Sequence, residues 1–166
     1  MITNAAYNGI QLPRVNGATV TGNTVTGSAQ PALQSAEWAG GIFTISGNTF
    51  STTSTGKAAV RLYGFTYNYQ PTFNITGNTI KDSKYGIQIG HGSAGNGYDL
   101  ATASYAFSGN TFTDITTDRL IVYLNVEASG NDLTTLNGLF AQVYGAGSTA
   151  ETISTGDPYT YVVGDR

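Results

Sequence analysis

Side chains that can act as acids, bases or fixed charges are sparse in this chain of 166 residues. Four of them could neutralise a substrate carboxylate or remove a proton beside it: Arg61, His91, Lys57 and the phenol of Tyr63. The alternative is a plain surface role. Arg61 and Lys57 would then lie at a solvated strand edge, and His91, between two glycines, would be an exposed loop residue.

A second possible chemistry requires a pair of carboxylates. Hydrolysis of a glycosidic bond uses two carboxyl groups that are roughly 5 to 9.5 Å apart, according to mechanism. Glu37 and Asp99 are the candidates, because both lie in insertions between the repeats described below. The candidate catalytic residues are therefore Arg61, His91, Glu37 and Asp99.

Aromatic residues gather in and around the same insertions. They are Trp38, Tyr63, Phe65, Tyr67, Tyr69, His91, Tyr98 and Tyr105. Sugars stack their C–H faces on such rings, while Gln, Asn and Arg orient hydroxyls and carboxylates by hydrogen bonds. We therefore expect glycan contacts from Trp38, Tyr63, Tyr67, Tyr69 and Tyr98. The alternative is that these rings only seal the insertions against the flank of the protein.

The element that must position these residues is a repeat. One phrase, apolar–Ser/Thr–Gly–Asn–x–apolar with slight variation, occurs five times, at 20–25, 45–50, 75–80, 107–112 and 128–133. Its asparagines are 25, 30, 32 and 21 residues apart, a period that indicates a solenoid with coils of unequal length. Alternation places the apolar positions inward, and glycine permits the sharp turn before asparagine. Stacked coils would align the asparagines in a hydrogen-bonded ladder.

A second short strand follows each asparagine at a nearly fixed distance. These segments are 9–12, 32–35, 59–62, 86–89, 120–123 and 138–141. In register they form one sheet, whose outward positions would be Gln11, Gln34, Arg61 and Gln88, followed by Val122 and Phe140. The insertions 37–41, 63–72 and 90–104 would build a wall beside this face.

The motif of a Gly-Ile-x-Ile strand followed by Ile-x-Gly-Asn-x-Ile resembles the right-handed parallel β-helix repeats of pectate-lyase-like proteins. The resemblance spans roughly residues 2 to 145. That family includes polysaccharide lyases, uronate epimerases, some glycosidases and phage tailspikes. The resemblance implies a substrate lying across the outward strand face, with Gln11, Gln34, Arg61 and Gln88 as its floor. The Asp-Pro-His signature of the epimerases is absent, since Asp157-Pro158 is followed by Tyr159.

Composition narrows the possible partners. A net charge of −3, a pI near 4.8 and only seven basic residues argue against nucleic acid and anionic membranes. The sequence has no apolar run long enough to span a bilayer, so no membrane insertion is expected. It has no cysteine and no tandem calcium-binding nonapeptide, so no cofactor is expected. Asp82, Asp114 and Asp118 read as turn residues, with a Ca²⁺-binding pair as the alternative.

The predicted fold is therefore an all-β, right-handed parallel β-helix of about five to six coils over residues 1–145. Residues 146–166 would form a cap or tail with a strand over 159–163. Because the sequence starts in mid-coil, we expect a fragment or the C-terminal part of a longer helix.

Three functions remain open at this stage. The first is a polysaccharide-binding module of a larger secreted, cell-surface or virion-associated protein. The second is a polysaccharide lyase or glycoside hydrolase. The third is a structural shaft or adhesin segment, with end-to-end or trimeric self-association.

Overall fold

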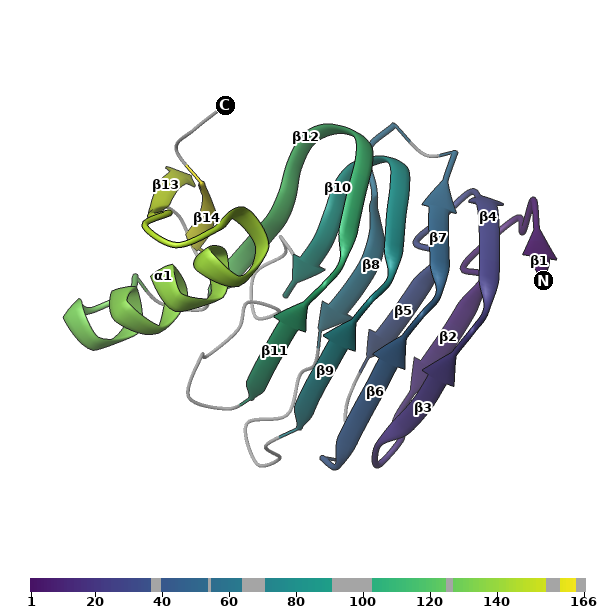
Figure 1. Cartoon of the computed structure of the whole chain (residues 1–166), viewed down its shortest axis with the longest axis horizontal. Coiled ribbons are helices and arrows are strands. Elements are labelled where there is room, and N and C mark those ends of the chain that lie inside the picture. The colour runs from purple at the N-terminus through teal and green to yellow at the C-terminus, as the bar shows by residue number, and fades with distance from the viewer. Residues whose placement is uncertain are drawn as a thin grey trace.

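The fold is a stack of strands closed at one end by a helix, as seen in a computed structural model (Figure 1). The structure describes residues 1–36, 40–53, 55–63, 71–90, 103–124, 127–154 and 159–163. Its elements are β1 (Ile2–Thr3), β2 (Ile10–Pro13), β3 (Ala18–Thr21), β4 (Thr24–Ser28), β5 (Leu33–Ala36), β6 (Ile42–Ser46), β7 (Thr49–Thr52), β8 (Ala58–Tyr63), β9 (Thr72–Thr76), β10 (Thr79–Ile89), β11 (Ser104–Ser108), β12 (Thr111–Leu124), α1 (Gly130–Tyr144), β13 (Ala150–Ser154) and β14 (Tyr159–Val163).

The strands form three parallel ranks that run along the stack. One rank is the sheet β3-β6-β9-β11, which precedes the Gly-Asn turns. The second contains β1, β4 and β7, followed by the first parts of β10 and β12. The third contains β2, β5 and β8, followed by the second parts of β10 and β12. Parallel pairing between successive coils confirms the predicted solenoid.

The core follows the apolar positions of the repeated phrase. Ile45 and Ile75 on one side of the turn, and Phe50 and Ile80 on the other, are fully buried. In the first rank, the rings of Phe43, Phe73 and Tyr105 stack along the axis, with centroids 4.7 and 5.5 Å apart. Because each coil repeats the same inward positions, apolar contacts continue from coil to coil.

The predicted asparagine ladder is present through four coils. The Asn23 side chain donates to Oδ1 of Asn48, Asn48 donates to Asn78, and Asn78 donates to Asn110, at 2.9 to 3.2 Å. The backbone N–H of each donating residue bonds the same Oδ1 atom at 2.8 to 3.0 Å. Gly22, Gly47, Gly77 and Gly109, which precede these asparagines, have φ between 62° and 64°. The turn therefore needs glycine for its left-handed backbone.

The fifth copy of the phrase is not part of the ladder, and this prediction was wrong. Ser129 lies just before α1, and its N–H and Oγ donate to Asp132 Oδ2 at 3.4 and 3.0 Å, in a capping-box arrangement. Asn131 therefore lies in an exposed first helical turn. The strand predicted over 138–141 was also wrong, since it is helix and Phe140 is buried in the core.

Helix α1 and β14 cover parts of the last coil. Gln142 Oε1 accepts the backbone N–H of Phe107 at 2.7 Å, and the hydroxyl of Tyr144 accepts those of Arg119 and Leu120 at 2.7 and 3.2 Å. The predicted strand at 159–163 is present as β14, which pairs antiparallel with Val122–Leu124 of β12. These side chains and strands satisfy backbone groups that a further coil would otherwise bond.

One buried hydroxyl offers a test of the core. Ser35 is fully buried in register between Leu12 and Leu62, and its Oγ has no hydrogen-bond partner in the part of the chain that the structure describes. We expect Ser35→Ala to raise the free energy of unfolding by about 1 kcal/mol, because it removes an unsatisfied polar group. Denaturant unfolding would measure the change.

The matched control is Ser28→Ala. Ser28 is also fully buried, but its Oγ donates to the carbonyl of Gln30 at 2.8 Å. The free energy of unfolding of this variant should fall by about 1 kcal/mol, because a buried hydrogen bond is lost. Equal destabilisation by the two substitutions would show that the Ser35 hydroxyl is satisfied.

Candidate functional site

The outward face of the third rank carries a continuous column of polar side chains. Gln11 pairs in register with Gln34, Gln34 with Arg61, and Arg61 with Gln88, on β2, β5, β8 and β10. Gln11 is exposed and Arg61 is half-buried. Gln34 and Gln88 are 5% and 8% exposed. The predicted alignment is therefore present, although two of its four members have little solvent contact.

Arg61 is the centre of a side-chain network on this face. Its Nε and Nη2 donate to Gln34 Oε1 at 3.2 and 2.8 Å. Its guanidinium carbon lies 5.3 Å from the centroid of the Tyr63 ring, and Gln34 Nε2 reaches the Tyr63 hydroxyl at 3.5 Å. The planar guanidinium is thus held on one edge by the amide oxygen and on one face by the ring.

The charge of Arg61 is not neutralised by a carboxylate within the described part of the chain. Burial lowers the pKa of Arg61 from its ordinary value, and its interactions with Tyr63 and Tyr123 act in the opposite direction. Arginine nevertheless remains protonated in proteins. Among the described residues the only hydrogen-bond partner of Arg61 is a neutral amide, and a desolvated cation in that state favours an added anion.

The column continues with Ile121, so the predicted outward position of Val122 was wrong. Gln88 pairs with Ile121, while Val122 pairs with Ile89 and lies in the core. The cause is a bulge: Ser83 and Tyr85 pair with Ile115 and Asp118, so β12 holds one more residue than β10 there. A shift of one residue exchanges the two faces of the strand beyond the bulge.

The corrected register brings Tyr123 to the outward face, where the sequence interpretation had missed it. Tyr123 follows the inward Val122, just as Tyr63 follows Leu62. Burial raises the pKa of Tyr123, as does Tyr85, whereas Arg61 lowers it. The phenol is therefore a neutral hydrogen-bonding group at pH 7. Its signal in the sequence is that each tyrosine directly follows an inward aliphatic residue, Leu62 or Val122.

Several predicted site residues lie outside the described residues: Glu37, Trp38, Tyr67, Tyr69, His91, Tyr98 and Asp99. Their roles stay predictions. Tyr105, grouped with the loop aromatics, lies in β11 and stacks on Phe73. Of the proposed catalytic residues, Arg61 alone is among those described, together with the binding candidates Gln11, Gln34, Gln88 and Tyr63.

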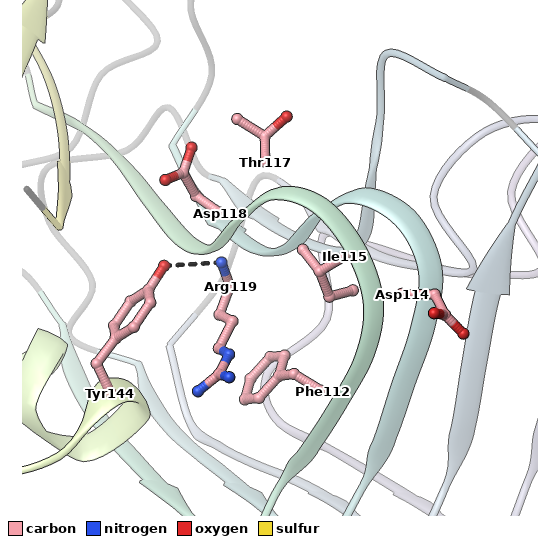
Figure 2. Close-up of a pocket in the computed structure, with 7 residues that line it drawn as sticks. All are labelled: Phe112, Asp114, Ile115, Thr117, Asp118, Arg119 and Tyr144. Atoms are coloured by element: carbon pink, nitrogen blue, oxygen red, sulfur yellow. Dashed lines mark hydrogen bonds between the residues drawn. The ribbon is translucent and has the colours of Figure 1, made fainter. Parts of the chain in front are cut away.

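A separate pocket of about 380 Å³ lies between the last coil and α1 (Figure 2). It is lined by Phe112, Asp114, Ile115, Thr117, Asp118, Arg119 and Tyr144. Burial raises the pKa of Tyr144, although the N–H groups of Leu120 and Arg119 oppose this shift by bonding its hydroxyl. Because that hydroxyl already joins α1 to β12, we assign it a structural role.

The acidic residues do not assemble a metal site within the described residues, where no three His, Cys, Asp or Glu side chains cluster. Asp82 and Asp114 have φ of 50° and 54°, the left-handed backbone of a turn, and Asp82 pairs with Lys81 at 3.2 Å. Asp118 differs, since it is buried within β12. In the same described segments, no helix is long and apolar enough to cross a membrane.

Three parallel strand ranks, the in-register coils and the asparagine ladder define a parallel β-helix, with the polar column on one of its faces. The family model described as the right handed beta helix region matches residues 1–112. The chain therefore belongs to the right-handed β-helix family, as its sequence predicts. No curated protein and no solved structure matches the chain significantly.

Proposed function

We propose that this β-helix binds polysaccharide, with the glycan lying across the outward face of β2, β5, β8 and β10. Gln11 offers an exposed amide at one end of the face, and Arg61 offers a fixed cation near its middle. A repeating ligand suits a repeating surface, because successive coils are about 4.8 Å apart and present similar groups at regular intervals. The sugars that this face favours carry carboxylates.

The observation that carries the proposal is the incomplete hydrogen bonding of the Arg61 guanidinium among the described residues. Gln34 holds Nε and Nη2 by one oxygen, which leaves Nη1 without a protein partner among the described residues. A sugar carboxylate bound there would form a charge-assisted hydrogen bond in a partly desolvated setting. A purely structural arginine is more commonly paired with an acidic side chain when it is buried.

The test is a substitution that keeps a polar, hydrogen-bonding side chain at the site but removes its charge. We expect Arg61→Gln to weaken binding of polygalacturonate or alginate at least about tenfold, because a hydrogen bond to a charged group contributes roughly 1.5–3 kcal/mol. Isothermal titration calorimetry on the purified chain would measure the affinity, and circular dichroism would verify folding.

The matched control is Arg119→Gln. Arg119 also lies over a tyrosine, 5.7 Å from the Tyr144 ring centroid, but on β12 beside α1 rather than on the polar column. Its loss should leave the affinity within about twofold. Equal affinity of the Arg61→Gln variant and the unaltered chain for an acidic polysaccharide would count against the proposed face.

The catalytic alternative stays a prediction. Its candidates His91, Glu37 and Asp99 lie outside the described residues, and no described carboxylate is paired with Arg61. The setting of the module in a larger secreted, cell-surface or virion-associated protein is likewise part of the proposal, as is self-association of its coils.

A further inference from the structure

We propose that Tyr63 and Tyr123 form a clamp for one sugar ring, with Gly90 between them. This inference rests on the proposed glycan-binding function and assigns Tyr123 to it. The three residues occupy equivalent positions on β8, at the end of β10 and on β12, three segments that lie side by side (Figure 1). Each directly follows a member of the register Leu62–Ile89–Val122.

The direction of the two tyrosines follows from their neighbours. Leu62, Ile89 and Val122 are fully buried in the core, so the residues after them face outward by strand alternation. Tyr63 lies on the outward face, because its ring contacts Arg61 and its hydroxyl contacts Gln34. Both tyrosines are half-buried and remain partly accessible.

Gly90 is required by the backbone at its position. Its φ is 77°, and a Cβ atom there would lie 2.5 Å from the carbonyl oxygen of Tyr123. Gly90 therefore places no side chain between Tyr63 and Tyr123, its two neighbours in this register. Two strand steps separate the tyrosines by about 9–10 Å.

That separation suits a single sugar ring held between two aromatic faces. Side chains stand roughly perpendicular to a sheet, so in the proposed clamp two rings at this spacing would accept one sugar ring in contact with each at about 4 Å. Arg61 lies one column away and interacts electrostatically with both tyrosines. The clamp would orient the ring so that a carboxylate reaches the guanidinium.

The experiment measures binding of polygalacturonate and alginate by titration calorimetry to three Tyr123 variants. Tyr123→Ala and Tyr123→Leu should each weaken binding roughly fivefold or more, because both remove the stacking ring. Tyr123→Phe, which keeps the ring, should stay within about twofold of the unaltered chain. The leucine variant preserves apolar volume, so it remains informative where the alanine variant loses stability.

Tyr7→Ala is the matched control, since Tyr7 is a tyrosine that is 78% exposed near the first coil. It should bind like the unaltered chain. Unaltered affinity in Tyr123→Leu, with binding still lost in Arg61→Gln, would overturn the clamp and leave the proposed function standing. Failure of the unaltered chain to bind either acidic polysaccharide would overturn both.

Discussion

Asn78→Ala should lower the free energy of unfolding by at least about 3 kcal/mol. The side chain of Asn78 donates to the carbonyl of Ile45 at 2.9 Å and to Asn110 Oδ1 at 3.0 Å. Its Oδ1 accepts the backbone and side-chain N–H groups of Asn48 at 3.0 and 2.9 Å. Alanine would leave several of these buried groups unsatisfied, because Asn78 is only 1% exposed.

The controls for this prediction lie at the two ends of the repeat pattern. Asn23 is the first residue of the ladder, and its Oδ1 accepts no hydrogen bond within the described residues. Asn23→Ala should therefore lower the free energy of unfolding by only about 1 kcal/mol. Asn131→Ala, in the exposed first turn of α1, should change stability by less than about 0.5 kcal/mol. Chemical denaturation would rank the three variants. An equal loss at Asn78 and Asn131 would contradict the ladder as a source of stability.

Gly86→Ala should lower the free energy of unfolding by about 3 kcal/mol through overpacking. An added Cβ at Gly86 would lie 2.6 Å from the backbone oxygen of Arg119 and 2.7 Å from Cε1 of Phe112. The Phe112 ring could move, but the oxygen belongs to a backbone held in the β10–β12 ladder. The adjoining coils would therefore have to separate locally. Thermal or denaturant unfolding would measure the effect.

Gly138→Ala is the opposite case and serves as the control. Gly138 lies within α1, and an added Cβ would meet nothing within 4 Å. Alanine has a higher helix propensity than glycine, so the free energy of unfolding of this variant should rise by about 0.5–1 kcal/mol. If Gly86→Ala proved as stable as the unaltered chain, the close approach of β10 and β12 at this corner would be wrong.

The solenoid could be predicted from the sequence because its information is local and repeated. Gly77 and Asn78 show the physical reason: the turn needs a left-handed backbone, and the ladder needs an amide that both donates and accepts. The same requirement recurs at each coil, so four copies of the phrase predict four turns. The alignment of Gln34 with Arg61 follows from that spacing.

The two errors in the predicted fold, at α1 and at the bulge in β12, have different causes. Ser129 and Asp132 fit the repeated phrase, but they also fit a capping box, and the apolar residues that follow, Leu136, Leu139 and Phe140, have helical spacing. The signal for α1 was therefore present and was assigned to the wrong structure. The bulge between Ile115 and Asp118 left no comparable signal, because an extra residue in a long strand preserves its composition.

Only part of the candidate site could be predicted from the sequence, because the rest depends on packing and on strand register. Arg61 could be identified from the repeat, but its attachment to Gln34 and Tyr63 depends on three-dimensional packing. Tyr123 became visible only after the register was corrected, since its assignment to the outward face depends on Val122 facing the core.

The most direct test of polysaccharide binding is to incubate the purified chain with polygalacturonate, alginate and a neutral galactan. Tryptophan and tyrosine fluorescence would report binding, and release of unsaturated or reducing sugar ends would report cleavage. We predict saturable binding of at least one acidic polysaccharide, weaker binding of the neutral one, and no product. Absence of binding to all three would contradict the account, and product release would show instead that the chain is an enzyme.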